Sequence, residues 1–390
     1  MAAATTRASS VHDINEDDPP FGSRFLTDES QVWTQNAWDH VPPPTDQEEI
    51  IAASLAKQRL SPVPEQDRIK YNEKPARHWD NFYKNNANNF FKDRKWLHNE
   101  FPKLVEATQA EAGPMRIVEI GCGAGNSVFP LLAANQNPDL ELFAYDYSSH
   151  AVKLVQNNPL YKNPPVGRIK ASVWDLTSGS LPPGFEDQPG SVDIVVLVFV
   201  LSALHPDEWG RAVLNVHKLL KPGGLVLLRD YGRYDLTQLR FKAGRLLDDE
   251  AGNFYIRGDK TRVYFFELDE LSLIFAGERA SKIDSSSNGA ISMTTTTEIM
   301  DEEADSPITT STETPTPKGT LASATPRSSD PEIHPNLLDS LFPHKDSSSL
   351  PVHPLFSVEK LGIDRRLLVN RKRQLKMYRV WMQGVFRKCG

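Results

Sequence analysis

The residues best suited to chemistry begin with three closely spaced glycines. Gly121, Gly123 and Gly125 follow the apolar run Met115–Ile120 and precede a helix predicted to begin near Ser127. Glycines at a strand-to-helix turn let the backbone bend sharply and approach a ligand closely, which a Cβ atom would prevent. Their G-x-G-x-G spacing differs from the G-x-G-x-x-G of dinucleotide pyrophosphate sites. Taken alone, the motif indicates either a small-molecule site or a tight turn that needs glycine for packing.

Two carboxylates follow at positions that complement this turn. Asp146 comes directly after the apolar run Leu140–Tyr145, where one acid commonly accepts hydrogen bonds from both hydroxyls of a ribose. Asp175 ends the next strand-like run, where it suits an adenine amino group. The run after that offers an apolar wall near Val198. The set predicts a site for an adenosine-like ligand.

These residues need a scaffold that brings the ends of several strands together. Five strand-like runs alternate with helical stretches such as Ser148–Gln156 and Pro206–Leu220. The runs are Met115–Ile120, Leu140–Tyr145, Gly167–Val173, Val192–Leu201 and Gly224–Arg229. The alternation predicts an α/β fold over 111–280, with a mostly parallel sheet covered on both faces. Right-handed crossovers place the carboxyl ends of the strands, and hence the ligand, along one edge.

The regions on either side of this core have a different character. Residues 1–20 are polar without periodicity and are expected to be disordered, whereas 21–110 are predicted to be helical and aromatic-rich. Residues 281–335 hold 27 Ser, Thr or Pro, which cannot bury enough surface to offset the entropy of ordering. We therefore expect 281–352 to be a disordered insertion. It precedes two strand-like segments within 353–390 that can form a hairpin.

The charge distribution points to a polyanionic partner. The formal charge of the chain is -7, but 281–335 carry nine acids against three bases and 1–30 carry six acids against two. The remainder is therefore net positive, and 365–390 hold nine Lys or Arg and no acid. A nucleic acid fits this distribution, although a positive end also occurs on ordinary soluble proteins.

Composition excludes several classes of protein. No apolar run reaches the roughly 18–20 residues of a membrane helix, and the N-terminus lacks the apolar core of a signal peptide. Cys122 and Cys389 are the two cysteines, too few for a disulfide framework or a cysteine-built metal site. We expect no membrane association, no metal and a reducing compartment.

The predicted helix Pro206–Leu220 ends at Leu220–Gly224. Over residues 115–230, the sequence resembles class I S-adenosylmethionine-dependent methyltransferases in the order of its glycine turn, its two acids and this helix end. The resemblance implies a Rossmann-like, seven-stranded sheet that closes with a reversed hairpin. Further stretches closely resemble the tRNA 3-methylcytidine methyltransferases, over most of 21–275 and over 357–388. The stretches are Phe21–Arg24, Asn36–Asp39, Phe90–Leu97, Val198–Ala203, Arg229–Asp235, Leu239–Phe241, Asn253–Asp259, Thr261–Phe266 and Arg365–Asn370.

This resemblance is nearest to the fungal and animal branch that acts on cytidine 32 of threonine and serine tRNAs. It implies S-adenosylmethionine as donor, an anticodon-loop base as acceptor and a cytoplasmic location, with the nucleus as an alternative. A protein partner that helps to choose the tRNA, such as seryl-tRNA synthetase, stays open. The implied cofactor contacts are Trp79 and Tyr83 of a W-x-x-x-Y pair, Gly121, Gly123, Gly125, Asp146, Asp175, Leu176 and Val198.

The acceptor side is predicted from chemistry together with the resemblance. Asp230, just after the fifth strand-like run, is the candidate catalytic carboxylate, with a buried acid paired to Arg229 or Arg233 as the alternative. A base flipped out of an RNA loop is held by aromatic and cationic planes, and basic side chains hold its phosphates. The predicted RNA contacts are Phe91, Arg94, Arg229, Tyr231, Arg233, Tyr234, Arg365, Arg366, Arg371, Lys372 and Arg373.

Three other functions compete with this interpretation. A class I methyltransferase acting on a small molecule or a protein side chain shares every cofactor feature. A non-catalytic RNA-binding or nucleotide-sensing module is disfavoured because Gly121, Gly123, Gly125, Asp146 and Asp175 are all intact. A dinucleotide oxidoreductase is disfavoured by the glycine spacing and by the second acid.

Overall fold

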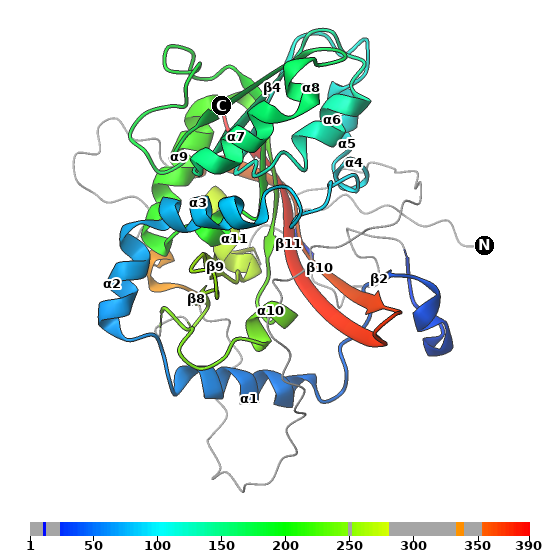
Figure 1. Ribbon diagram of the computed structural model, residues 1–390, viewed down its shortest axis with the longest axis vertical. Coiled ribbons are helices and arrows are strands. Elements are labelled where there is room, and N and C mark those ends of the chain that lie inside the picture. Colours follow the sequence, from blue (N-terminus) through cyan, green and yellow to red (C-terminus); the bar gives the residue numbers. More distant parts are fainter. Residues whose placement is uncertain (1–10, 13–23, 249–251, 281–332, 339–352) are drawn as a thin grey trace, which may run out of the picture.

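A nine-stranded mixed sheet runs through the part of the protein that the structure describes (Figure 1). This computed structural model describes residues 11–12, 24–248, 252–280, 333–338 and 353–390. One side of the sheet, from the edge strand β5 inward, has the strand order β5-β4-β3-β6-β7, all parallel. These strands are β3 (Met115–Ile120), β4 (Leu140–Asp146), β5 (Arg168–Val173), β6 (Val192–Val198) and β7 (Leu220–Tyr231). The predicted α/β fold is confirmed.

The strand order reverses at β3, which has β4 on one side and β6 on the other. Crossovers that leave in opposite directions from such a point open a crevice at the carboxyl ends of the strands. All seven residues of β6 are buried, as expected for a central parallel strand covered on both faces. The predicted ligand edge therefore lies at the ends of β3, β4 and β6.

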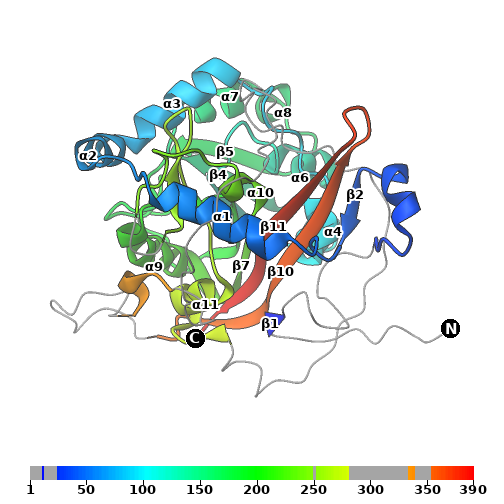
Figure 2. The same ribbon diagram turned by 90° about the horizontal axis from the view of Figure 1, so that it is seen from below.

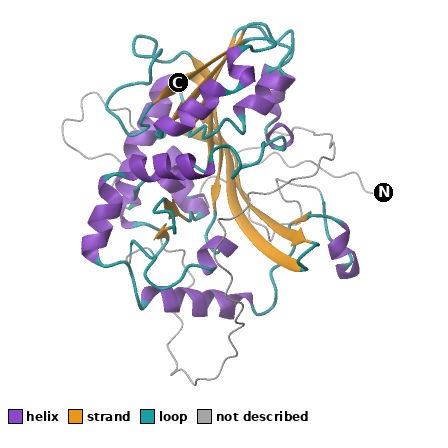
Figure 3. Cartoon of the chain, viewed as in Figure 1, coloured by secondary structure: helices purple, strands orange, loops and turns teal. Residues whose placement is uncertain are grey.

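Helices cover both faces of the sheet (Figure 3). One apolar cluster joins the sheet to α9 (Trp209–Leu219) and α11 (Leu268–Ala276), which follows the small hairpin of β8 (Phe254–Ile256) and β9 (Arg262–Tyr264). A second cluster covers the opposite face. Its helices are α4 (Leu97–Glu100), α5 (Pro102–Ala107), α6 (Val128–Ala134), α7 (Ser149–Asn157) and α8 (Pro159–Lys162).

The C-terminal segments form a long antiparallel hairpin of β10 (Phe356–Asn370) and β11 (Leu375–Lys388). Strand β11 pairs antiparallel with β7, so the hairpin completes the sheet as predicted. Figure 2 shows its tip projecting beyond the rest of the sheet. The sheet has nine strands instead of seven because β1 (Val11–His12) and β2 (Ala37–Asp39) both pair with β10. These short strands cover part of an otherwise open edge.

The N-terminal region is mostly helical, as expected. After the 3-10 helix η1 (Glu29–Thr34) and β2, it contains α1 (Gln47–Arg59), α2 (Glu65–Glu73) and α3 (Pro75–Asn86). In Figure 1, α3 crosses the middle of the molecule next to α7. Short helical turns also follow β6 and β7, namely η2 (Leu201–Ala203), η3 (Pro206–Glu208) and α10 (Leu236–Leu239). None of the helices within the described ranges is long and apolar enough to cross a bilayer.

Most of the predicted disordered segments, including 281–332 and 339–352, lie outside the described residues. The six residues between these two ranges correct the prediction, because they form the 3-10 turn η4 (Pro335–Leu337) on the core. Ile333 and Leu337 are buried in the same apolar cluster as α9 and α11. His334 Nε2 lies 3.1 Å from Asp248 Oδ2, and the His334 N–H donates to Glu270. This part of the insertion is packed and hydrogen-bonded.

Candidate active site

A cavity opens at the carboxyl ends of the parallel strands, and residues of α3 form part of its wall. Seven of the nine predicted cofactor residues line it: Trp79, Tyr83, Gly121, Asp146, Asp175, Leu176 and Val198. Gly123 and Gly125 do not reach its wall. The sheet supplies the floor through the ends of β3, β4 and β6, while the N-terminal region supplies a roof.

The glycine turn requires its glycines for two reasons. Gly121, Gly123 and Gly125 have φ angles of +67°, +54° and +89°, in the left-handed region that disfavours side chains. A Cβ atom on Gly123 would lie 2.5 Å from the Tyr83 hydroxyl, and one on Gly121 would lie 2.6 Å from a methyl group of Val200. The turn is therefore packed tightly against the roof, and the close approach of Tyr83 depends on the bare backbone at Gly123.

Asp146, at the end of β4, joins the glycine turn to the start of α7. Its two carboxylate oxygens accept hydrogen bonds from the backbone N–H groups of Gly123 and Ser148, both at 2.8 Å. Burial raises the pKa of Asp146 to about 6, although these N–H groups oppose the shift. Each oxygen keeps a further lone pair, so this cavity-lining carboxylate can still accept from ribose hydroxyls.

Asp175 lies on the next strand end, on the same side of the cavity. One of its oxygens, Oδ1, accepts from both the N–H and the hydroxyl of Thr177, at 2.8 and 2.7 Å. This turn fixes the carboxylate while its second oxygen makes no bond within the turn. The side chains of Leu176 and Val198 form the neighbouring apolar wall. An acid beside an apolar slot suits an adenine ring and its amino group.

Trp79 and Tyr83 form the roof. They are four residues apart on α3, and their rings stack at a centroid distance of 6.1 Å with 29° between planes. Residues four apart share one face of a helix, and both rings lie on the cavity wall. Phe82, which also lines the cavity, packs edge-to-face against both rings, at 5.5 and 5.1 Å. Contact between these two rings and the cofactor stays a prediction.

Rings and guanidinium groups line another part of the same cavity, which we call the ring-lined compartment. Phe199, just past β6, packs against Tyr231 of β7, with ring centroids 4.6 Å apart and 39° between the planes. The Arg257 guanidinium carbon lies 5.4 Å from the Tyr231 ring, and that of Arg94 lies 5.9 Å from the Phe199 ring. Phe91 lines the cavity beside Arg94, at 6.0 Å. The structure thus brings the predicted Phe91, Arg94 and Tyr231 together.

Phe199 and Arg257 were not predicted as site residues. Phe199 has a φ angle of +59°, uncommon for a bulky residue, and its N–H donates to the carbonyl of Arg229 at 2.8 Å. Its position just after an apolar strand at the ligand edge was an available signal. Arg257 follows β8, more than 20 residues beyond Tyr231 in the chain, and no local pattern relates the two.

Asp230, the predicted catalytic carboxylate, is fully buried behind this compartment and does not line the cavity. It accepts from the backbone N–H groups of Ser202, at 3.0 Å, and Tyr231, at 2.9 Å, both of which do line it. Burial raises the pKa of Asp230 to about 6, partly opposed by these bonds. The alternative pairing with Arg229 or Arg233 is not formed, since those groups pair with other acids. Its placement suits a positioning role for two walls of the site.

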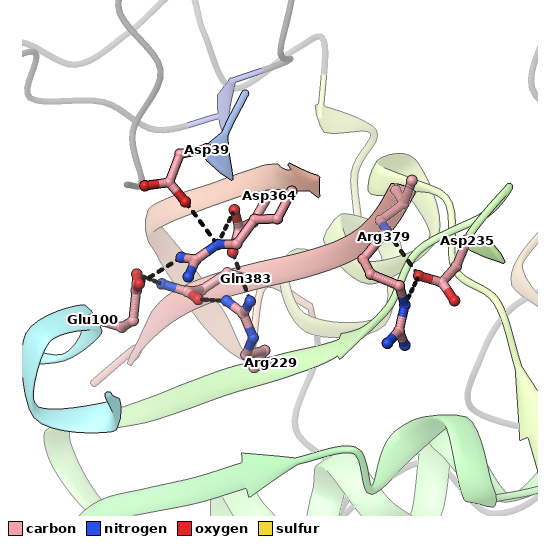
Figure 4. A network of polar contacts seen from close by, with 9 residues as sticks. Asp39, Glu100, Arg229, Asp235, Asp364, Arg379 and Gln383 are labelled. Atoms are coloured by element: carbon pink, nitrogen blue, oxygen red, sulfur yellow. Dashed lines mark hydrogen bonds and ion pairs between the residues drawn. The ribbon is translucent and has the colours of Figure 1, made fainter. Parts of the chain in front are cut away.

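Two predicted RNA contacts are corrected by the structure. Arg229 and Arg366 are 2% and 5% exposed and belong to a buried polar network (Figure 4). Arg229 pairs with Asp364 at 2.6 Å, and Arg366 pairs with Asp364 at 3.0 Å and with Glu100 at 2.6 Å. Both guanidinium groups are committed to carboxylates away from solvent, so neither is placed to bind a phosphate. Charge counts along the chain carry no signal that separates buried from exposed arginines.

The remaining predicted RNA contacts fall into two groups. Arg233 is buried and pairs with Glu267 at 3.2 Å, beside Tyr234, so the structure corrects this predicted phosphate contact as well. Arg365 is half-buried on β10. Arg371, Lys372 and Arg373 are exposed in the turn between β10 and β11. This turn is the projecting tip seen in Figure 2, and we call Arg371, Lys372 and Arg373 the basic tip. The basic tip is the part of the predicted RNA surface that the structure leaves open to solvent.

The residues present fit an adenosyl cofactor. A nucleoside needs hydroxyl acceptors, a flat apolar slot and close backbone approach, which Asp146, the Leu176 and Val198 wall, and Gly121 provide in one cavity. The aromatic roof covers the same space. The part of the same cavity that is lined by Phe199, Tyr231 and Arg257 has the chemistry to hold a planar ligand.

Comparisons with known proteins agree with this geometry. Residues 118–226 match a family model described as a methyltransferase domain. The chain is 43% identical over 368 residues to the tRNA(Thr) (cytosine(32)-N(3))-methyltransferase of Saccharomyces cerevisiae, covering 94% of this chain and 45% of that protein. It is 37% identical to the tRNA N(3)-methylcytidine methyltransferase of Schizosaccharomyces pombe, covering 96% and 93%.

A third relative, the tRNA N(3)-methylcytidine methyltransferase of Drosophila melanogaster, is 35% identical, with 94% of this chain and 88% of that protein covered. The chain spans less than half of the length of the budding yeast relative but nearly all of the fission yeast and fly relatives. Similarity at this level over almost the whole of two relatives, together with a cavity built for an adenosyl group, places the chain in the tRNA N(3)-methylcytidine methyltransferase family.

Proposed function

We propose that the protein transfers the methyl group of S-adenosylmethionine to N3 of cytidine 32 in the anticodon loop of threonine or serine tRNAs. The names of the relatives support the base and its position, and the budding yeast relative is named for tRNA(Thr). The observation that carries the proposal is that Phe199, Tyr231 and Arg257 line the same cavity as the predicted cofactor residues. An aromatic and cationic compartment is the kind of surface that holds an unstacked base.

The reaction requires little acid–base chemistry from the protein. Bound S-adenosylmethionine supplies an electrophilic methyl group on a sulfonium. Neutral cytidine already has a lone pair on N3, so the N–CH₃ bond forms as the S–CH₃ bond breaks, and the positive charge passes to the base. The residues of the compartment have to orient the ring so that N3 faces the methyl group. Positioning of this kind lowers barriers by up to about 7–11 kcal/mol in well-oriented systems.

Phe199 and Tyr231 are placed to hold the ring by stacking, and Arg257 is placed beside Tyr231. Asp230 holds the backbone of Ser202 and Tyr231 at the compartment wall. We propose that its carboxylate also favours the developing positive charge on the base through this wall. The ring contacts and the role of Asp230 are both parts of the proposal.

Incubation with labelled S-adenosylmethionine and total tRNA, followed by nucleoside analysis, tests the function. We expect the label in 3-methylcytidine, and in transcripts carrying cytidine 32 but not in those where position 32 is uridine. Label in 1-methyladenosine, or in protein or a small molecule alone, would overturn the substrate assignment. The last two results would favour the alternative of a methyltransferase with a protein or small-molecule substrate.

The basic tip is expected to bind phosphates. Replacing Arg371, Lys372 and Arg373 with alanine should weaken tRNA binding and lower the slope of log affinity against log salt by up to about three, because each phosphate contact contributes about one to that slope. Affinity for the cofactor should not change, since the tip is not part of the cavity. Filter binding of tRNA over a range of salt concentrations measures the tRNA affinity and its salt slope.

A matched variant separates this effect from loss of positive charge in general. Lys162, Arg168 and Lys170 are also exposed and lie on or near β5, at the opposite end of the strand order from β10. Their triple alanine variant should keep the parent salt slope. An equal loss of slope in both triple variants would show that the basic tip has no special role.

Two further parts of the proposal concern the choice of tRNA and the location of the protein in the cell. We propose that selection of the isoacceptor involves a second protein, such as seryl-tRNA synthetase, and that the protein works in the cytoplasm or the nucleus. Both statements rest on the family resemblance. The budding yeast relative is about twice as long as this chain.

A further inference from the structure

The roof helix α3 is attached to the floor of the cofactor site through one acidic side chain. Asp80 is the sole acid in α3, whose sequence is PARHWDNFYKNN, and it follows Trp79 directly. Its Oδ1 atom accepts a hydrogen bond from the Ser148 hydroxyl at 2.7 Å and from the His150 N–H at 3.2 Å. The imidazole Nδ1 of His150 also lies 3.3 Å from this oxygen. Asp80 therefore binds the first turn of α7 from outside that helix.

Ser148 connects this contact to the cofactor carboxylate. Its hydroxyl, which donates to Asp80, also accepts from the Ala151 N–H at 3.2 Å and so caps α7. Its backbone N–H donates to Asp146 Oδ1 at 2.8 Å. A single residue thus joins the roof to the carboxylate that faces the cavity.

The second carboxylate oxygen of Asp146 is also connected to the roof, through Gly123. Asp146 Oδ2 accepts from the Gly123 N–H, and Gly123 is the residue whose missing Cβ makes room for the Tyr83 hydroxyl. Helix α3 is therefore tied to the floor on both sides of Asp146, by Asp80 through Ser148 and by Tyr83 through packing on Gly123. Neither Asp80 nor Ser148 lines the cavity.

We propose that Asp80 is a positioning residue for cofactor binding, which holds α3 closed over the cavity by its bonds to Ser148 and His150. In this role it keeps the Trp79 and Tyr83 rings over the cofactor and supports the orientation of Asp146. The Asp80 side chain is 31% exposed, so water can replace its bonds to Ser148 and His150. No role in the methyl transfer step itself is assigned to it.

Calorimetric titration with S-adenosylhomocysteine, the non-reacting product, tests the proposal on the intact chain. Asp80→Ala should weaken binding roughly tenfold, because a hydrogen bond to a charged group contributes about that much to an equilibrium. Asp80→Asn should recover most of the affinity, since its amide oxygen accepts from the same hydroxyl and N–H groups. Glu73→Ala, which removes an exposed carboxylate at the end of neighbouring α2, should bind like the parent.

Hydrogen exchange and a double variant distinguish positioning from general stability. In Asp80→Ala, exchange should rise in residues 75–86 and at the start of α7, with β3, β4 and β6 as protected as in the parent. The combination with Ser148→Ala should cost less than the sum of the two single changes, because both remove the bond between Asp80 and Ser148. Unchanged affinity in Asp80→Ala, an equal loss in Asp80→Asn, or faster exchange throughout the core would each overturn the proposal.

The inference rests on the cofactor site and not on the identity of the RNA. If nucleoside analysis finds a product other than 3-methylcytidine while Asp80→Ala still loses affinity for S-adenosylhomocysteine, the proposed substrate fails and the role of Asp80 stands. If the product is 3-methylcytidine and Asp80→Ala binds S-adenosylhomocysteine like the parent, the proposed substrate stands and the role of Asp80 fails.

Discussion

Replacing Asp146 with alanine is expected to lower the affinity for S-adenosylhomocysteine by at least about 100-fold, because hydrogen bonds to a charged group contribute about 1.5–3 kcal/mol each and a ribose offers two hydroxyls. The change also leaves the Gly123 and Ser148 N–H groups without their acceptor, which loosens the glycine turn and the start of α7. Methyl transfer at moderate cofactor concentration should fall in parallel. Calorimetry on the purified variant measures the loss.

A change at the other end of the same strand provides the control. Asp139, directly before β4, is exposed and far along the strand from the cavity. Asp139→Ala should bind the cofactor like the parent. If Asp146→Ala also binds like the parent, while its circular dichroism shows a native fold, then Asp146 does not hold the cofactor and the site assignment fails.

The same carboxylate predicts a pH dependence for cofactor binding. Burial raises the pKa of Asp146 from 3.8 to about 6, so the group becomes protonated as the pH falls through 6 and loses acceptor capacity. Affinity should therefore be highest above that pH and fall below it. Asp146→Asn, which cannot titrate, should bind more weakly and show a flatter profile over the same range.

The second large effect is expected on stability, at Asp364 of β10. This carboxylate is fully buried and bonds to Arg229 at 2.6 Å and to Arg366 at 3.0 Å (Figure 4). Asp364→Ala leaves two buried guanidinium groups with one acid fewer, which should lower the free energy of unfolding by about 3–5 kcal/mol. Arg229 suffers most, because its other side-chain hydrogen bond goes to the neutral Gln383. Urea unfolding followed by circular dichroism measures the difference.

An exposed ion pair on the same strand gives the matched comparison. Glu359 pairs with Arg387 across the hairpin, with side chains 36% and 41% exposed. Glu359→Ala should lower the free energy of unfolding by less than about 1 kcal/mol, because solvent screens such a pair. Similar losses of unfolding free energy in Asp364→Ala and Glu359→Ala would contradict the view that burial makes the ion pairs of Asp364 important for stability.

The pH dependence of this stability has a definite sign. Burial alone would raise the pKa of Asp364, but the guanidinium groups of Arg366 and Arg229 outweigh it and lower the pKa to about 2. A depressed pKa means that the stabilisation is present above the ordinary value of 3.8 and is lost as the pH falls toward 2. The difference in unfolding free energy between the parent and Asp364→Ala should therefore narrow over that range.

The buried network also has a consequence for the site. Arg229 lies next to Asp230 and Tyr231 on β7, and its carbonyl accepts from Phe199. Its guanidinium lies between the rings of Trp96 and Trp381, at 4.9 and 4.5 Å. Through Glu100 and Asp39, the network joins α4 and β2 of the N-terminal region to the C-terminal hairpin. The ring-lined compartment is thus supported by residues from three distant parts of the chain.

The sequence alone determined the features that depend on local order along the chain. A glycine turn after an apolar strand, with acids at the ends of the next two strands, needs only the rule that parallel strands present their carboxyl ends at one edge. The W-x-x-x-Y pair needs only the helical repeat, and both rings lie on the cavity wall. The closing hairpin followed from its strand-like pattern, and β10 and β11 complete the sheet.

The tertiary structure alone decided which charges are buried and which distant residues meet. Arg229 and Arg366 have the same composition and charge signal as the exposed Arg371 and Arg373. Yet Arg229 pairs with Asp364, 135 residues away, and Arg366 pairs with Glu100, 266 residues away, as well as with its strand neighbour Asp364. Arg257 reaches Tyr231, and Asp80 reaches Ser148, in the same way. Burial and long-range pairing depend on how the layers pack, because periodicity and composition describe only neighbours along the chain.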